Sequence, residues 1–291
     1  MKTDKPSRPL LRYHGGKWKL APWIIGYFPT HKIYTEAYGG GASVLLRKSR
    51  SYAEVYNDLD DEIVNLFRVL RSKDANELIR QIAFTPFSRH EFDDSYVESG
   101  DPVEQARRTV FRFAAGHSTT GANANKWKTG FRCNVTRSGS TPAQDWSNMP
   151  SVLVSIVERL QGVVIENLPA IDVLRKYDDV NALHYVDPPY PFSTRNERWA
   201  GSCYRHEMTD ADHAEMAGVL RTLKGAIVVS GYKCDLYDRL FDGWRFVQRS
   251  SHADSALDRI ETLWISPGAT CNLTLFEYDD IIDEEYPGGR E

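Results

Sequence analysis

Cysteine is scarce in this chain, which has four among its 291 residues. Their positions show none of the close pairs typical of zinc sites. We therefore expect no metal and no disulfide framework, but reduced thiols at Cys133, Cys203, Cys234 and Cys271. Long apolar runs are absent too, and no segment reaches the length of a membrane span. The basic start, Met1 to Tyr13, lacks the apolar core of a secretory signal. These absences predict a cytoplasmic protein with no membrane partner.

A large excess of charge is also absent, because the formal net charge is -4. This value argues against a protein that coats nucleic acid over its whole surface. The charge is nevertheless uneven, since seven basic residues and one acidic residue, Glu104, lie between Val103 and Ser140. The second half of this stretch is rich in Gly, Ser, Thr and Asn, so it can meet phosphates and read base edges. A solvated surface loop is the alternative interpretation.

Strands and helices are predicted to alternate through most of the chain, which indicates an α/β fold. The strand 33–36 leads through three glycines into a helix at 43–46. The strand 53–56 leads into an amphipathic helix with Ile63, Leu66, Phe67 and Leu70 on one face. Thr209 and Asp212 form a capping pattern that predicts the start of a helix ending at Leu220. Further strands are predicted at 163–166, 183–186, 226–230, 244–248 and 260–265, and further helices at 152–160, 170–177 and 235–241.

Residues 74–147 interrupt this alternation. Only helices are predicted there, at 75–82 and 102–115, and the basic stretch completes the segment. We therefore expect one domain made of residues 1–73 and 148–285, an insertion at 74–147, and a short tail at 286–291.

A glycine turn and an acidic residue indicate a nucleoside site. Gly39, Gly40 and Gly41 follow the first strand, and Asp58 follows the second, at about the twenty-residue spacing of nucleotide sites. In such sites the backbone N–H groups approach the ligand and the carboxylate holds ribose hydroxyls. Val44 occupies the third glycine position of the G-x-G-x-x-G pattern, which disfavours a pyrophosphate and a nicotinamide-dependent oxidoreductase. A glycine turn without a ligand is the simpler alternative.

The segment Asp187-Pro188-Pro189-Tyr190 follows the apolar run 183–186, which we interpret as a buried strand. The prolines fix the backbone and remove two donors, so the neighbouring carbonyls stay available as acceptors. With the carboxylate and the aromatic ring they suit a planar ring that carries an amine, and adenine fits best. An ordinary proline-rich turn is the alternative for this segment taken alone.

Four segments, taken in order, resemble the DNA adenine methyltransferases of the Dam type, which transfer a methyl group from S-adenosylmethionine to adenine. They are Arg12-Tyr13-His14-Gly15-Gly16-Lys17, Glu36-Ala37-Tyr38-Gly39-Gly40-Gly41-Ala42-Ser43, Tyr56-Asn57-Asp58-Leu59 and the D-P-P-Y segment. Ala42 stands where some members have another glycine. The resemblance covers nearly the whole chain. It implies a Rossmann-like S-adenosylmethionine-dependent methyltransferase sheet with a helical target-recognition insertion.

The resemblance also implies roles for single residues. In catalysis, Asp187 and the Pro188 carbonyl accept hydrogen bonds from the adenine amine beside Pro189, while Tyr190 stacks on the flipped base. Lys17 reaches the methionyl carboxylate of the cofactor, and Asp58 holds its ribose. The full set of implied cofactor contacts is Tyr13, Lys17, Glu36, Tyr38, Gly39, Gly40, Asp58, Leu168 and Asp187. Candidate DNA contacts are Arg12, Asn123, Lys126, Trp127, Lys128, Arg132 and Arg137.

We thus expect a site-specific, monomeric adenine methyltransferase that acts on double-stranded DNA without a metal, in a bacterial or phage-infected cell, as in restriction-modification. Methylation of the cytosine amine is the nearest alternative, although enzymes with that activity more often have Ser at the position of Asp187. A DNA-binding protein that kept the fold and lost catalysis is another, and the intact D-P-P-Y segment and Lys17 argue against it.

Overall fold

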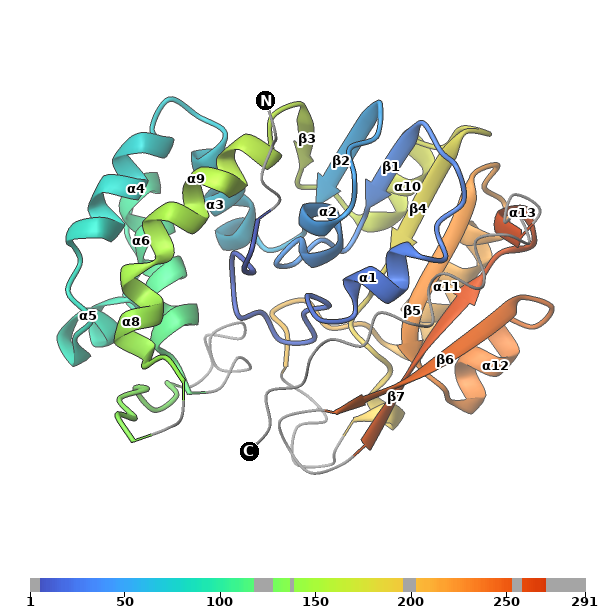
Figure 1. Ribbon diagram of the computed structural model, residues 1–291. Helices are drawn as coiled ribbons and strands as arrows, with labels where there is room; N and C mark the ends of the chain where they lie inside the picture. Colours follow the sequence, from blue (N-terminus) through green and yellow to red (C-terminus); the bar gives the residue numbers. More distant parts are fainter. Residues whose placement is uncertain (1–5, 118–127, 137–138, 196–202, 253–257, 271–291) are drawn as a thin grey trace.

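The computed structural model describes residues 6–117, 128–136, 139–195, 203–252 and 258–270 of the chain. Within these residues the core is a seven-stranded sheet with the strand order β3-β2-β1-β4-β5-β7-β6 (Figure 1). The predicted α/β fold is therefore confirmed. Among the described residues, no helix combines the length and the apolar composition of a membrane span.

Five neighbouring strands of the sheet run parallel. They are β1 (Ile33–Glu36), β2 (Ala53–Asn57), β3 (Val163–Glu166), β4 (Ala182–Val186) and β5 (Ala226–Tyr232). All five residues of β4 are buried, because helices cover both faces of the sheet. A strand covered on both faces favours apolar side chains in succession, and β4 follows this except at His184, whose buried ring lies 3.4 Å from Asp178.

The remaining two strands, β6 (Arg245–His252) and β7 (Asp258–Ile265), are antiparallel to each other. β7 is inserted between β5 and β6 and runs antiparallel to β5, with Glu261 opposite Tyr232. The beginning of β7 therefore lies at the edge of the sheet where the parallel strands end.

Helices cover both faces of the sheet. Val228 of β5 packs into one apolar core with α1 (Ala21–Ile25), α2 (Ser43–Arg47) and α3 (Asp61–Leu70). Its neighbour Val229 packs into a second core with α10 (Ala170–Lys176), α11 (Asp210–Leu220) and α12 (Asp235–Leu240). This alternation follows from the two-residue period of a strand, and it gives a three-layer α/β/α arrangement. The short helices η1 (Phe192–Thr194) and α13 (Pro267–Thr270) lie in the connections.

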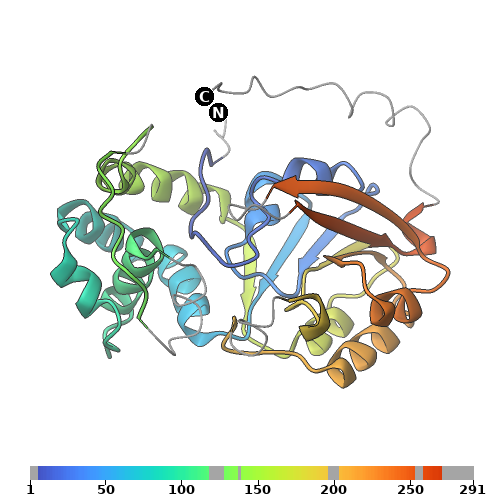
Figure 2. The same cartoon turned by 90° about the horizontal axis from the view of Figure 1, so that it is seen from below.

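A group of helices lies beside the sheet, next to the β3 edge (Figures 1 and 2). It contains α4 (Ala75–Phe84), α5 (Arg89–Asp94), α6 (Pro102–Ala115), α8 (Pro142–Ser147) and α9 (Met149–Arg159). Phe111 of α6 meets Trp146 of α8 edge to face, with the ring centroids 4.8 Å apart. α6 also packs on α3, so the apolar core of the group continues into the core on one face of the sheet. The segment before α1 passes between the group and the sheet (Figure 2).

Candidate active site

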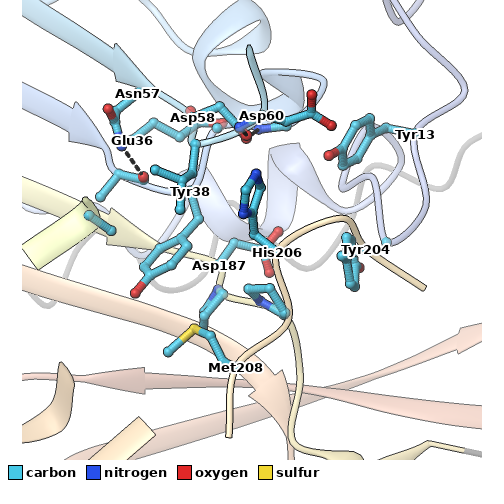
Figure 3. A pocket seen from close by; sticks show the side chains of 18 of the residues that line it. Tyr13, Glu36, Tyr38, Asn57, Asp58, Asp60, Asp187, Tyr204, His206 and Met208 are labelled. Atoms are coloured by element: carbon cyan, nitrogen blue, oxygen red, sulfur yellow. Dashed lines mark hydrogen bonds between the residues drawn. The ribbon is translucent and has the colours of Figure 1, made fainter. Parts of the chain in front are cut away.

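The glycine turn and the D-P-P-Y turn meet where the strand order of the sheet reverses. β1 and β4 are neighbours, and the chain continues from β1 toward β2 on one side and from β4 toward β5 on the other. Ligands of open parallel sheets bind in the crevice at such a point, at the carboxyl ends of the strands. Both turns line one cavity of about 340 Å³ (Figure 3), a size typical of sites for small molecules.

Tyr13 forms one wall of this cavity and touches the glycine turn. A Cβ atom on Gly40 would lie 2.7 Å from Cε1 of the Tyr13 ring, and the φ angle of Gly40 is +47°. Glycine is thus required here by both space and backbone conformation. The Tyr13 ring also stacks on Phe113 of α6, with the centroids 5.7 Å apart. One ring therefore connects the helical group with the glycine turn.

Two further residues define the shape of the glycine turn. A Cβ atom on Gly39 would overlap the ring of Tyr56, so the turn packs directly on β2. Ala42 precedes α2 with a φ of 53° and a ψ of 34°, a left-handed conformation. For a residue other than glycine this conformation costs about 1 kcal/mol. Glycine would adopt this conformation without that cost.

Asp58 is held between two backbone turns. Its Oδ2 accepts a hydrogen bond from the N–H of Gly40 at 2.7 Å, and its Oδ1 accepts from the N–H of Asp60 at 2.8 Å. Burial raises the pKa of the Asp58 carboxyl, while these N–H groups oppose the rise. Asp58 and Asp60 both line the cavity, where they present acceptors for hydroxyl groups.

Leu168 does not line the cavity, but its position is fixed by Asn57. The Asn57 side chain accepts from the Leu168 N–H at 2.9 Å and donates to its carbonyl at 3.0 Å. The next three residues, Pro169, Ala170 and Ile171, do line the cavity. The predicted contact therefore lies one residue before the part of the chain that faces the cavity.

Glu36 lies at the end of β1 and is buried, with 3% of its surface exposed. Its Oε2 accepts from the Tyr34 hydroxyl and from the Leu45 N–H, both at 2.8 Å. Burial raises the pKa of Glu36 to about 8, so this carboxyl holds a proton at neutral pH. Tyr38 lines the cavity on the side opposite Tyr13 and Tyr204 (Figure 3).

Asp187 and Lys17 form an ion pair at the cavity, with Nζ 3.0 Å from Oδ1. Lys17 also donates to the Gly15 carbonyl at 2.7 Å and lies 3.7 Å from the carboxylate of Glu261. Burial alone lowers the pKa of Lys17, but the two carboxylates outweigh it and raise the pKa above its ordinary value. Lys17 therefore stays charged, and in the described structure its partners are carboxylates of the protein.

Pro188 and Pro189 line the cavity beside Asp187, whereas Tyr190 does not. The Tyr190 hydroxyl donates to Glu261, and the Lys17 ammonium lies 4.8 Å from the centre of the Tyr190 ring. The ring also meets Tyr232 edge to face at 4.8 Å. The structure thus brings Asp187, the prolines and the glycine turn to one cavity and places Tyr190 just behind it.

Sequence reasoning missed the segment Cys203–Met208, which closes one side of the cavity. Five of its residues line the cavity: Tyr204, Arg205, His206, Glu207 and Met208. Figure 3 shows His206 and Met208 on the same connecting segment, next to Asp187. The available signal was a set of charged and aromatic residues just before the Thr209 cap.

Ion pairs hold this segment from two sides. Arg195 pairs with Glu207 at 2.7 Å and donates to the Tyr190 carbonyl at 2.8 Å. Arg205 reaches the other way, to Asp60 at 2.6 Å and to Glu62 at 2.8 Å. Glu62, in the first turn of α3, also pairs with the buried Arg112 of α6. The cavity wall is therefore connected to both the D-P-P-Y turn and the helical group.

The candidate DNA contacts divide into three groups. Asn123, Lys126, Trp127 and Arg137 lie outside the described residues. Lys128 pairs with Asp93 and lies near the rings of Phe92 and Tyr96, with its side chain 45% exposed. Arg132 donates to the Ala114 carbonyl, and Arg12 donates to the Gly116 carbonyl, each at 3.2 Å. Arg12 and Arg132 thus both bond to the chain at the end of α6.

The positive charge of the basic stretch is partly neutralised in the folded protein, because acidic side chains from other segments pair with its arginines. Arg107 pairs with Glu91 and Glu104, Arg108 pairs with Glu104, and Arg112 is buried against Glu62. These three arginines lie in the first half of the stretch and were not among the candidate DNA contacts, and the structure pairs all of them with acids. A count of charges along the sequence cannot include the acids at 62 and 91.

The chain was compared with known protein families and with curated proteins. The family model described as D12 class N6 adenine-specific DNA methyltransferase matches residues 13–253. The chain is also similar to a modification methylase, StsI, of Streptococcus sanguinis, with 24% identity over 213 residues. That match covers 66% of this chain and 30% of the relative, so the chain spans about a third of the length of that protein.

Proposed function

The chain belongs to the family of D12 class N6 adenine-specific DNA methyltransferases, and from this premise we propose that it methylates the N6 amine of adenine in duplex DNA. One observation carries the proposal. The carboxylate of the D-P-P-Y turn and the glycine turn line the same cavity at the carboxyl ends of β4 and β1. Such an arrangement can hold a nucleoside methyl donor and an amine acceptor next to each other.

The cavity suits S-adenosylmethionine, which carries its reactive methyl group on a positively charged sulfur. Asp58 and Asp60 present carboxylates to which ribose hydroxyls can donate, and Pro169 and Ile171 offer an apolar wall to a purine ring. Gly40 has no side chain, so its backbone can lie against the Tyr13 ring. Tyr13, Lys17, Glu36, Tyr38 and Gly39 also line the cavity, which supports their proposed roles as cofactor contacts. For Leu168 we propose an indirect role, through the residues that follow it.

Asp187 is the proposed acceptor for the adenine amine. The Lys17 ammonium, 3.0 Å away, favours the ionised carboxylate, which has lone pairs only and so accepts hydrogen bonds. The Pro188 carbonyl is the second proposed acceptor. Two acceptors on the two amine hydrogens favour a pyramidal nitrogen with its lone pair directed outward, and alignment with the methyl group supplies much of the remaining rate.

Adenine must leave the duplex to reach this cavity, because its amine is paired inside the helix. We propose that Tyr190 borders the flipped base from behind Asp187, and that the helical group, with the residues 118–127, contacts the DNA around it. Residues 74–147 are then the target-recognition insertion, and residues 1–73 and 148–285 the catalytic domain, which contributes α9 to the helical group. The protein is proposed to act as a monomer in the cytoplasm of a bacterial or phage-infected cell. The relative named as a modification methylase supports a role in restriction-modification.

The test is to incubate the purified protein with unmethylated bacterial DNA and S-adenosylmethionine that carries a labelled methyl group. The DNA is then digested to nucleosides, which are separated. Labelled N6-methyladenine is expected. Label on cytosine instead would keep the reaction type and refute the choice of base. DNA binding without any label would favour a protein that has lost catalysis.

A further inference from the structure

Glu261 is a buried acid that none of the sequence motifs pointed to. It lies in β7 with 2% of its surface exposed, and it shares its face of the sheet with Leu263, two residues later, which packs in the core of α1, α2 and α3. Because β7 runs antiparallel to β5, its early residues lie at the carboxyl ends of the parallel strands. The antiparallel strand thus brings a carboxylate to the carboxyl ends of the parallel strands, where the proposed active site lies.

The partners of Glu261 are residues of the proposed active site. The Tyr190 hydroxyl donates to its Oε1, and the Lys17 ammonium lies 3.7 Å from the same atom. Both partners are donors, and Lys17 has no acceptor, so these contacts suit an ionised carboxylate. Asp187 pairs with the other side of Lys17 at 3.0 Å. One ammonium is therefore shared by two carboxylates.

The charges of this cluster do not cancel. Burial raises the pKa of both Asp187 and Glu261, and the Lys17 ammonium between them opposes the rise. Asp187 and Lys17 alone would sum to zero, whereas with both carboxylates ionised Asp187, Lys17 and Glu261 together would carry one net negative charge. When the N–C bond forms and the S–C bond breaks with its electron pair left on sulfur, positive charge passes to the amine nitrogen, which then releases a proton to water. A fixed negative charge beside that nitrogen stabilises the transition state, and it acts strongly in a site with little water.

We propose that Glu261 is a positioning residue that holds Lys17 and so keeps a net negative charge beside the methyl-transfer site. This inference rests on the proposed function and adds a residue to it. The simpler alternative is that Glu261 only anchors the Tyr190 hydroxyl. The two alternatives differ in what happens when the charge is removed and the hydrogen bond is kept.

Two ligands of almost the same shape separate these alternatives without any turnover. S-adenosylhomocysteine has a neutral sulfur, whereas sinefungin carries an ammonium group near the position of the methyl sulfonium. Their dissociation constants are measured by calorimetry for the native protein and for Glu261→Gln, whose amide oxygen still accepts from Tyr190. We expect Glu261→Gln to weaken sinefungin by about five-fold and S-adenosylhomocysteine by less than about two-fold, because one unit charge is removed near one ligand's cation.

Glu166→Gln is the matched control, because Glu166 has the same kinds of partners. Its carboxylate accepts from the Tyr177 hydroxyl at 2.5 Å and pairs with Lys176 at 2.7 Å, but it does not line the cavity. This variant should leave the ratio of the two constants unchanged. Tyr190→Phe, which removes the hydrogen bond and keeps the charges, should leave the ratio within about two-fold. Equal ratios in the native protein and in Glu261→Gln would overturn the proposal, as would a changed ratio in Tyr190→Phe.

Methyl transfer is measured in parallel. Glu261→Gln should slow single-turnover methylation by about 10- to 100-fold. Glu261→Asp keeps the charge and should retain the native ratio of binding constants. It would replace Glu261→Gln if that variant did not fold. If the native protein methylates DNA and Glu261→Gln does so at the same rate, only the proposed role of Glu261 is refuted. A native protein that methylates nothing refutes the proposed function and this inference with it.

Discussion

Arg195 and Glu207 form an ion pair, with Nη2 2.7 Å from Oε2, that joins the chain after the D-P-P-Y turn to one wall of the cavity. Glu207 also accepts from the N–H groups of Cys203 and Tyr204 at 2.8 and 2.9 Å, so it shapes the whole turn. The Arg195 side chain is 9% exposed and lies 5.5 Å from the centre of the Tyr204 ring. The wall therefore depends on a charge that comes from the neighbouring turn.

Replacing Arg195 by Gln should weaken the binding of S-adenosylhomocysteine by about ten-fold, because the change leaves Glu207 without its cation and loosens Tyr204. Calorimetry on the purified variant measures this. Arg239→Gln, an exposed change on α12, is the control and should bind normally. Unchanged affinity in Arg195→Gln would show that the wall keeps its shape without the ion pair.

Asp187→Ala should abolish methyl transfer, with a loss of at least about a thousand-fold, because no carboxylate then accepts from the reacting amine. The fold and most of the DNA affinity should remain. The measurement is single-turnover labelling together with a DNA-binding assay, and Asp172→Ala, on the surface of α10, serves as the control. Near-normal turnover in Asp187→Ala would refute the proposed mechanism.

Glu36 should make the folded protein less stable as the pH rises. Its folded-state pKa of about 8 lies above its ordinary value of 4.5, so between these values the folded protein holds a proton that the unfolded chain has released. Stability contributed by this group therefore declines from about pH 4.5 to pH 8 and levels off above. In Glu36→Gln the decline should be smaller, by up to ~4 kcal/mol between pH 5 and pH 8.5. Urea denaturation at both pH values measures the difference.

Glu77→Gln is the matched control for this comparison, since Glu77 is exposed in α4 and pairs with Arg80. Its pH dependence in the same range should equal that of the native protein. If Glu36→Gln also follows the native curve, the Glu36 carboxyl does not hold a proton in the folded state.

Replacing Lys126, Lys128 and Arg132 by Ala should flatten the salt dependence of DNA binding, because the slope falls by about one for every phosphate that the protein no longer neutralises. A decrease of three is not expected, since Lys128 is already paired with Asp93. The slope of log Kd against log salt measures the effect. Lys32, Arg175 and Lys224, which precede the parallel strands at the opposite edge of the sheet, provide a charge-matched control. An unchanged slope would place the DNA-binding surface elsewhere.

The sequence was sufficient wherever the determining interactions are local. The Thr209 and Asp212 capping box begins α11 as predicted, and the apolar run of β4 is buried as a strand. The glycine turn was recognised because Gly40 needs a positive φ angle, which is a property of a single residue. The short helices α1, α5 and α8 were missed. The helices α2 and α12 are equally short, but each follows a strand, so the alternation of strands and helices indicated them.

Pairs that are distant in sequence could not be predicted. Glu261 is 71 positions away from Tyr190, and only the antiparallel insertion of β7 brings them together. The clue was present, because strand alternation places Glu261 on the apolar face of Leu263. The basic stretch misled for the related reason that Glu62, the partner of Arg112, belongs to another helix.

The position of the Tyr13 ring bears on the thermodynamics of binding, because the ring contacts both the glycine turn at the proposed cofactor site and the helical group proposed to contact DNA. It packs on the glycine turn and stacks on Phe113 of α6. If α6 moves when DNA binds, this ring would pass the movement to the turn, and the binding of DNA and of the cofactor would be linked through one side chain. Linkage is reciprocal, so whatever factor the cofactor adds to the affinity for DNA, DNA must add to the affinity for the cofactor. The order in which the two ligands arrive then makes no difference to the stability of the final complex.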